Sequence, residues 1–284
     1  MFAGKCWHVA RLLCRPRTNS RHFASSPGII TKEVLATSPN KYIGEFLTPE
    51  FLHGITAHTE AAAIDCVHLA PYSFQLITPN CPLYTASADE AKTYPFPDPF
   101  WGFCWPGSYA LCRYVQEHPE VVEGKIVLDF AAGGGMASIM SLYLGARVAI
   151  ANDIDRWSCA ASLVNTLVNL PPSHHAAMHV VADNLIGHSI AQVASTILTD
   201  ETLDPTDWVV LAGDVCYEEP LATDVMSWLA TWARGGVRVL IGDPGRQFLP
   251  QAQLTEVATY PLPPTLAQDN YGLPVGAVWS INAT

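Results

Sequence analysis

Between residues 126 and 242, short apolar runs alternate with longer segments that are rich in helix-forming residues. Apolar runs of four to six residues bounded by turns are typical of strands that are buried on both faces. The expected elements, in chain order, are strand 126–130, helix 136–144, strand 147–151, helix 157–170, strand 179–182, a poorly periodic stretch 187–203, strand 208–213, helix 221–234 and strand 237–242. This alternation predicts an α/β, Rossmann-like, mostly parallel sheet with helices on both faces.

The segments on either side of this pattern are less regular. Residues 33–100 are broken by prolines, and we expect an N-terminal extension over 33–107 that packs on a main domain at 108–284. A helix is expected over 108–118. Apolar residues at 257–260 and 275–281 can add one or two antiparallel edge strands.

A glycine-rich turn follows the first strand and is the strongest chemical signal in the chain. Gly133 and Gly135 allow positive φ and close backbone approach, so the turn can hold a ligand at a helix N-terminus. Asp153 follows the next strand, where a carboxylate can accept hydrogen bonds from both ribose hydroxyls of an adenosine. The turn therefore predicts a nucleotide-like cofactor, although a tight turn without a ligand is the alternative.

Two details favour S-adenosylmethionine over NAD. The dinucleotide motif lacks its third glycine, because Ser138 occupies that position. Asp129, four residues before Gly133, would repel a pyrophosphate but suits a sulfonium ligand that carries an amino group.

Further candidate residues lie after the third and fourth strands of the pattern. Asp183 and Asn184 can bond the amine and a ring nitrogen of adenine, although an acid at a strand end also serves as a helix N-cap. Asp214 and Tyr217 would lie beside the methyl group, where they can orient an incoming amine, and desolvation would help that amine lose its proton. The alternatives are a helix cap for Asp214 and a core aromatic for Tyr217.

Two other segments can face the same edge. Trp105, in an aromatic-rich segment before a Pro-Gly turn, can cover the cofactor. Asp243 and Arg246 can face the substrate, or they can be solvent charges on a turn.

The composition limits the partners and the location. Residues 1–32 hold six basic residues and no acid, which is typical of a mitochondrial transit peptide, the alternative being a disordered basic tail. Without them, nine basic residues face 26 acidic ones, a formal charge near −17. Nucleic acid is thereby disfavoured as a partner and a lysine-bearing protein surface is favoured. We expect a monomer.

Other classes of site find little support in the sequence. No apolar run is long enough for a membrane span, and the eight cysteines include no C-x-x-C pair. We therefore expect neither a zinc site nor a disulfide framework. The histidines at 174, 175, 179 and 188 are expected in surface or capping roles rather than as metal ligands.

Several motifs together resemble a known enzyme family. They are the segments 77–81, 99–107, 151–155, 213–217 and 240–246, the last three reading Ala-Asn-Asp-Ile-Asp, Gly-Asp-Val-Cys-Tyr and Leu-Ile-Gly-Asp-Pro-Gly-Arg. They resemble the class I, seven-β-strand methyltransferases, and among these the lysine methyltransferases of the electron transfer flavoprotein β subunit. One departure is that Ala131 and Ala132 stand where that family usually has Gly-Ser.

The resemblance implies a seven-stranded sheet, S-adenosylmethionine as the methyl donor, lysines of the flavoprotein β subunit as acceptors, and the mitochondrial matrix as the location. Three other hypotheses stay open on the sequence. They are a methyltransferase for another protein or a small amine, a non-catalytic binding module with the same fold, and an NAD-dependent oxidoreductase.

Overall fold

The computed structural model describes residues 30, 32–63, 72–197, 204–270 and 272–281, and its centre is one seven-stranded sheet. The strand order is β5-β4-β3-β6-β7-β9-β8. The first five strands in this order run parallel, β9 pairs antiparallel with β7, and β8 pairs antiparallel with β9. The strands are β3 (Ile126–Phe130), β4 (Val148–Asn152), β5 (Met178–Val181), β6 (Trp208–Gly213), β7 (Arg238–Asp243), β8 (Leu254–Pro261) and β9 (Val275–Ile281).

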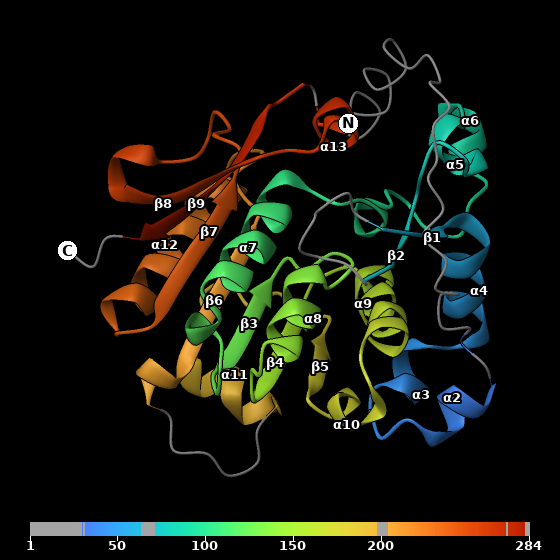
Figure 1. Cartoon of the computed structure of the whole chain (residues 1–284), viewed down its shortest axis with the longest axis horizontal. Coiled ribbons are helices and arrows are strands. Elements are labelled where there is room, and N and C mark those ends of the chain that lie inside the picture. The colour runs from blue at the N-terminus through green and yellow to red at the C-terminus, as the bar shows by residue number, and fades with distance from the viewer. Residues whose placement is uncertain (1–29, 31, 64–71, 198–203, 271, 282–284) are drawn as a thin grey trace.

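Helices cover both faces of this sheet (Figure 1). On one face lie α7 (Pro106–Glu117), α8 (Met136–Tyr143) and α9 (Arg156–Asn169), and on the other α11 (Ile190–Ile197) and α12 (Leu221–Arg234). The strand sequence explains this arrangement, because successive side chains point to opposite faces. In β3, Val127 joins the core beneath α7 and α8, whereas Ile126 and Leu128 join the core beneath α12.

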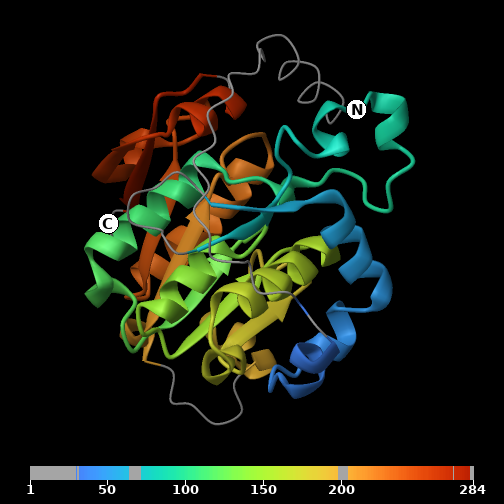
Figure 2. The ribbon, with the colours of Figure 1, turned by 45° about the vertical axis from the view of Figure 1, so that its right-hand side comes forward.

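The N-terminal segment packs beside this sheet rather than joining it (Figure 2). Its elements are α2 (Lys32–Thr37), α3 (Ile43–Phe46), α4 (Pro49–His58), α5 (Pro82–Thr85), α6 (Ala88–Ala91), the hairpin of β1 (Glu60–Ala62) and β2 (Phe74–Leu76), and the 3₁₀ turn η1 (Phe100–Gly102). Four of them, α3, α4, β2 and η1, contact α9. Short elements complete the chain: η2 (Pro119–Val121), α10 (Pro172–His175), η3 (Pro205–Asp207), η4 (Gln251–Gln253) and α13 (Pro264–Asp269).

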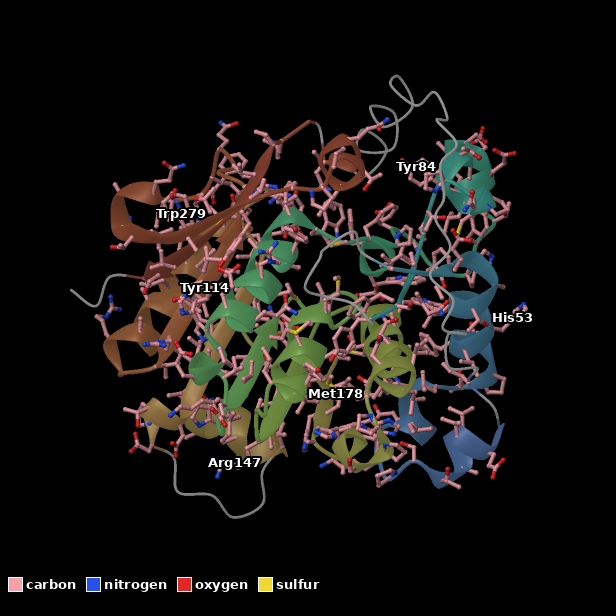
Figure 3. All side chains as sticks on the ribbon, viewed as in Figure 1. His53, Tyr84, Tyr114, Arg147, Met178 and Trp279 are labelled. Atoms are coloured by element: carbon pink, nitrogen blue, oxygen red, sulfur yellow. The ribbon has the colours of Figure 1, made fainter. Side chains whose placement is uncertain are left out.

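Residues 38–42 fasten the N-terminal segment to the edge strand β5. The amide of Asn40 donates hydrogen bonds of 2.7 and 2.8 Å to the carbonyls of His175 and Met178, the latter labelled in Figure 3. Ser38 bonds His175, and the Tyr42 hydroxyl lies 3.0 Å from Nδ1 of His179. Burial, together with the charge of Lys41, lowers the pKa of His179 to about 4, so this histidine is neutral at physiological pH.

The sequence-based prediction of the fold class is confirmed, with corrections in detail. His175 and His179 are buried, so of the expected surface or capping roles the surface role does not hold for these two, whereas His175 bonds the carbonyl of Leu170 at the C-cap of α9. The stretch 187–203, expected to be poorly periodic, contains α11. Of the two tail strands only β8 is an edge strand, because β9 lies between β7 and β8. The described part of residues 32–100 holds five α-helices and a hairpin, although the prolines of this segment led us to expect an irregular pattern.

The proposed transit peptide, residues 1–32, lies almost wholly outside the described residues. Within the described part of the chain, no helix is both long and apolar enough to cross a membrane.

Candidate functional site

The turn between β3 and α8 takes the backbone conformation that its glycines were expected to allow. Gly133 has φ of 53° and Gly135 has φ of 75°, where it is the N-cap of α8. Ala131 also adopts a positive φ, of 56°. This conformation costs an alanine roughly 1–2 kcal/mol, which a glycine would avoid. The chain therefore keeps the turn even where its sequence departs from glycine.

Asp153 fixes the turn from the neighbouring strand. One carboxylate oxygen accepts a hydrogen bond of 3.0 Å from the backbone N–H of Gly133, and the other accepts one of 3.0 Å from the N–H of Asp155. Burial raises the pKa of Asp153, and these two N–H donors work against that rise. Asp155 caps α9 by accepting from the N–H of Trp157.

Asp129 lies behind the turn and is bonded to α8. Its Oδ2 accepts two hydrogen bonds of 2.8 Å from Ser138, one from the backbone N–H and one from the hydroxyl. Burial raises the pKa of Asp129 to about 7. The bonds to Ser138 make this carboxylate a cap for the first turn of α8, which the helix dipole favours.

The ends of β4 and β5 form the next part of the site. Asp183 and Asn184 are exposed, and Asn184 accepts a bond from the N–H of Ile186. Buried Asn152 donates to the carbonyls of Val181 and Asp183, so it holds the end of β5 against β4. The sequence prediction gave Asn152 no role.

Ile154 is a second residue that the prediction passed over. It directly follows Asp153, and 74% of its surface is exposed. A large aliphatic side chain left open beside an acidic residue can cover the face of a flat ligand. An apolar residue placed directly after a strand-end acid was the sequence signal that could have identified it.

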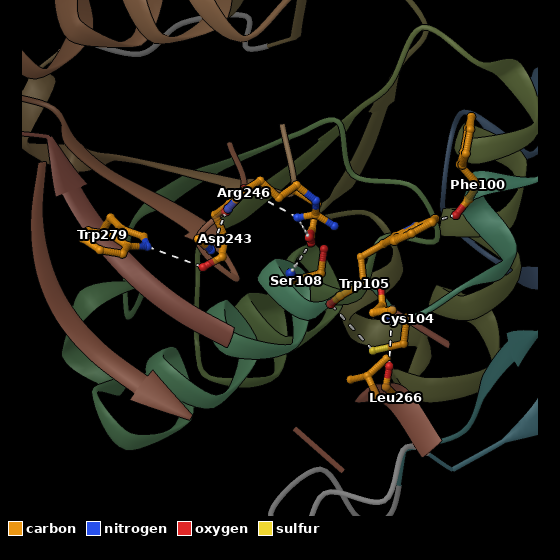
Figure 4. Close-up of polar contacts among 11 residues, drawn as sticks. Phe100, Cys104, Trp105, Ser108, Asp243, Arg246, Leu266 and Trp279 are labelled. Atoms are coloured by element: carbon orange, nitrogen blue, oxygen red, sulfur yellow. Dashed lines mark hydrogen bonds and ion pairs between the residues drawn. The ribbon is translucent and has the colours of Figure 1, made fainter. Parts of the chain in front are cut away.

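The aromatic-rich segment 100–105 lies against the glycine turn. Trp101 is fully buried, and its Cα lies 3.7 Å from the place that a Cβ on Gly133 would occupy. Trp105 is half-buried, and its indole N–H donates a bond of 2.8 Å to the carbonyl of Phe100. Figure 4 shows Trp105 between Ser108 and Phe100, so the same segment reaches from the glycine turn to the start of α7.

Helix α7 begins immediately after Trp105 and is pressed onto the carboxyl ends of β6 and β7. A Cβ on Gly107 would lie 2.0 Å from the carbonyl oxygen of Gly242 and 2.6 Å from Oδ2 of Asp214. Only glycine fits at such a contact. The Trp-Pro-Gly, Gly-Asp and Gly-Asp-Pro-Gly-Arg motifs, far apart in the sequence, therefore meet here.

Asp214 belongs to an ionic cluster at this contact. One of its carboxylate oxygens pairs with the Arg246 guanidinium, and the other accepts a bond of 3.0 Å from the N–H of Ser108. Asp243 accepts from the N–H groups of Gly245 and Arg246, and its second oxygen lies 3.5 Å from the guanidinium. Neither Asp243, which is fully buried, nor Arg246 is a solvent charge.

Tyr217 lies a short way along the same loop and is 52% exposed. Partial burial raises the pKa of its hydroxyl, and the charges of Glu218 and Asp153 add to the rise. Tyr217 follows β6, which pairs directly with β3, the strand that leads into the glycine turn. Cys216, next to it, is buried, and its thiol pKa is raised to about 12, so this thiol is no nucleophile at neutral pH.

The predicted residues thus gather at one edge of the sheet, as the carboxyl ends of parallel strands must. Gly133, Gly135, Asp153, Asp183 and Asn184 lie on the side of β3 and β4. Trp105 lies at the rim, and Asp214 and Tyr217 lie on the side of β6. Asp129 is the one that points into the protein, bonded to Ser138. Among the described residues, no group of three or more histidine, cysteine or acidic side chains is placed to hold a metal ion.

Known proteins resemble this chain at two levels. A family profile described as ribosomal protein L11 methyltransferase (PrmA) matches residues 110–206, which include the glycine turn and Asp153 but not Asp214. A ribosomal protein L11 methylase structure from Lactobacillus delbrueckii subsp. bulgaricus has 17% identity and a TM-score of 0.42, and the match covers 63% of this chain and 81% of that one.

Curated relatives match over much more of the sequence. The electron transfer flavoprotein beta subunit lysine methyltransferase of Danio rerio is 38% identical over 215 residues, which are 74% of this chain and 75% of the relative. The human protein of the same name is 34% identical over 250 residues, covering 85% of this chain and 86% of the relative.

Proposed function

This chain belongs to the family of electron transfer flavoprotein beta subunit lysine methyltransferases, and from that premise we propose that it transfers methyl groups from S-adenosylmethionine to lysines of that flavoprotein subunit. The observation that carries the proposal is the meeting of two half-sites at one edge of the sheet. The glycine turn with Asp153 forms the donor side, and Asp214 with Tyr217 forms the acceptor side.

The donor side fits an adenosine-bearing ligand. A Cβ on Gly133 would have only the Cα of Trp101 within 4 Å, so the space beside this glycine is open. We assign Asp153 to the ribose hydroxyls, from which its oxygens can accept in addition to the N–H groups of Gly133 and Asp155, and exposed Ile154 can cover one face of the adenine. Exposed Asp183 and Asn184 can bond the edge of the base. We assign Trp105 to the wall of this site.

Asp129 acts on the donor indirectly, through the glycine turn. Its bonds to Ser138 hold the first turn of α8 in place behind the glycines. We infer that it supports the shape of the turn that faces the donor.

The acceptor side must align a neutral amine with the methyl carbon of the donor. A lysine has an unperturbed pKa of about 10.4, so it must lose a proton before it attacks. In the transfer, the amine lone pair forms the new N–CH₃ bond as the S–CH₃ bond breaks and its electrons return to sulfur. Tyr217 can accept a hydrogen bond from the amine or donate one to it, and Asp214 can orient it.

A mitochondrial protein as the acceptor agrees with the composition of the N-terminus. We propose that residues 1–32 direct the chain to the matrix, where an acidic enzyme surface attracts a lysine-bearing partner.

The test is to incubate the purified chain with methyl-labelled S-adenosylmethionine and a mitochondrial extract, and to separate the labelled proteins by size. Label in a band that an antibody to the flavoprotein β subunit removes supports the proposal. Label in another protein or in small molecules means a different acceptor. A folded sample that does not bind the donor in calorimetry means a non-catalytic module. As a control, Asp214→Ala is expected to bind the donor but transfer no label.

A further inference from the structure

The acceptor side contains a charge arrangement that a simple amine-binding carboxylate does not need. Asp214 and Asp243 are two acids that share one guanidinium, that of Arg246. The arginine side chain is 19% exposed, and the two acid side chains are 9% and 0% exposed. Figure 4 shows Arg246 reaching from the turn after β7 towards the start of α7, where Ser108 lies.

The backbone around Asp214 is held in an unusual shape. Asp214 has φ of 60°, a conformation that a residue with a Cβ rarely adopts, and its N–H donates a bond of 2.8 Å to the carbonyl of Gly242. Strained residues of this kind persist only where their surroundings fix them. Here the backbone bond, Ser108 and Arg246 all fix the same carboxylate.

The groups that face this carboxylate come from three elements. Arg246 and Asp243 come from the end of β7 and its turn, Cys216 from the loop of Asp214 itself, and α7 contributes the uncharged Ser108. Glu219, further along the loop, interacts with Cys216. Arg246 is therefore the cation that acts directly on Asp214.

A lone carboxylate would be the wrong partner for the reacting lysine. An opposite charge within about 4–6 Å stabilises the charged form of a group by about 1–3 pH units, so a bare Asp214 would keep the lysine as an ammonium that cannot attack. A carboxylate that is paired with an arginine still accepts a hydrogen bond, but it stabilises the ammonium form of the amine less than a bare carboxylate does.

We propose that Arg246 is a positioning residue that fixes the Asp214 carboxylate and offsets one of the two negative charges of Asp214 and Asp243, so that the acceptor lysine reacts as the neutral amine. This rests on the proposed function, because it needs an amine acceptor at this side of the sheet. Arg246 acts through Asp214 and forms no bond to the methyl group.

The test compares the pH dependence of kcat, at saturating flavoprotein β subunit and S-adenosylmethionine, in the wild-type chain and four variants, because kcat reports the ionisation of the bound lysine. In Arg246→Gln we expect the acid-side midpoint to move to higher pH by about one unit or more, since the ammonium then takes the place of the guanidinium as the cation beside Asp214 and Asp243. In Arg246→Lys, which keeps the charge, the midpoint should lie between those of the wild type and Arg246→Gln. Arg238→Gln is the matched control, because Arg238 is exposed at the opposite end of β7.

A variant that should move the pH midpoint in the opposite direction distinguishes a charge effect from a purely structural one. Asp243→Asn keeps the oxygen that accepts from Gly245 and Arg246 but removes one negative charge. It should move the midpoint to lower pH, whereas simple damage to the fold would lower activity at every pH. This variant keeps the proposal testable if Arg246→Gln does not fold.

Three outcomes decide the matter. Opposite shifts in Arg246→Gln and Asp243→Asn, with donor binding unchanged in calorimetry, support the proposal. An active wild-type enzyme with midpoints that do not move in either variant overturns it. A wild-type chain that binds the donor but methylates no lysine at any pH overturns the proposed function instead.

Discussion

The glycine turn offers a matched pair of substitutions whose effects should separate structure from ligand binding. Gly133 and Gly135 both have positive φ, so alanine costs about 1–2 kcal/mol at either position. Their surroundings differ. A Cβ on Gly135 would lie 2.7 Å from Oγ, 2.8 Å from Cβ and 3.1 Å from Cα of Ser162, whereas one on Gly133 would meet only the Trp101 Cα, at 3.7 Å.

The Ser162 backbone belongs to α9 and cannot give way cheaply, so Gly135→Ala carries an overpacking cost of about 1–3 kcal/mol in addition to the φ cost. We expect it to destabilise the protein by about 2–5 kcal/mol, and Gly133→Ala by about 1–2 kcal/mol. For a chain of this size each kcal/mol corresponds to about 2–4 °C in Tm. Gly124→Ala, at the other end of β3 and with φ of 70° and no atom within 4 Å of its Cβ, is the control for φ alone.

Donor binding should rank the same variants in the opposite order. The open side of Gly133 is the space that we assign to S-adenosylmethionine, so its added methyl group should weaken binding more than that of Gly135, once both variants are confirmed to be folded. Urea unfolding gives the stability ranking and calorimetry gives the binding ranking. Equal destabilisation by the two substitutions, or stronger loss of binding in Gly135→Ala, would refute the assigned orientation of the turn.

Three further predictions concern side chains around the site. The pKa of Asp129 is about 7 in the folded protein and 3.8 for the unperturbed carboxyl group, so its protonated form stabilises the fold fully below pH 3.8 and this contribution is lost as pH rises through 7. Asp129→Asn should therefore remove up to about 4 kcal/mol from the change in unfolding free energy between pH 4 and 8, measured in urea. Asp153→Asn should weaken donor binding in calorimetry roughly 10-fold or more, because a charged acceptor for the ribose is lost. Asn40→Ala should destabilise the fold by about 1–3 kcal/mol in the same urea assay, since two buried carbonyls lose their donor, whereas exposed Thr56→Ala should not.

The parallel part of the sheet was predictable because its strands are buried on both faces. The strand β6 is apolar up to Gly213, and only Asp129 interrupts the apolar run of β3, so β3, β6 and α12 lie where the pattern placed them. The order of β8 and β9 was not predictable, because a strand near the C-terminus can pair with either edge of the sheet. The alternation of polar and apolar residues in its sequence does not identify the strand that it pairs with. Prolines hid the helices of residues 33–100, since a proline in the first turn of a helix is well tolerated. Pro49 and Pro82 both occupy that position.

The sequence could not predict the direction in which the side chains of the site point. The positions of Asp153 and Asp214 at strand ends were clear from spacing, but the pairing of Asp214 with Arg246 depends on two turns meeting beside α7. Likewise Asp129 precedes the turn in the sequence as a ligand-facing acid would, yet it bonds Ser138 instead. Contacts of this kind come from tertiary packing, which spacing along one chain does not encode.

The most direct test of the account is the intact mass of purified electron transfer flavoprotein β subunit after incubation with the chain and S-adenosylmethionine. The account predicts mass increments of whole methyl groups on lysine with the wild-type chain and no increment with Asp153→Ala, which lacks the ribose-binding carboxylate. An unchanged mass with a wild-type chain that is folded and binds the donor would contradict it.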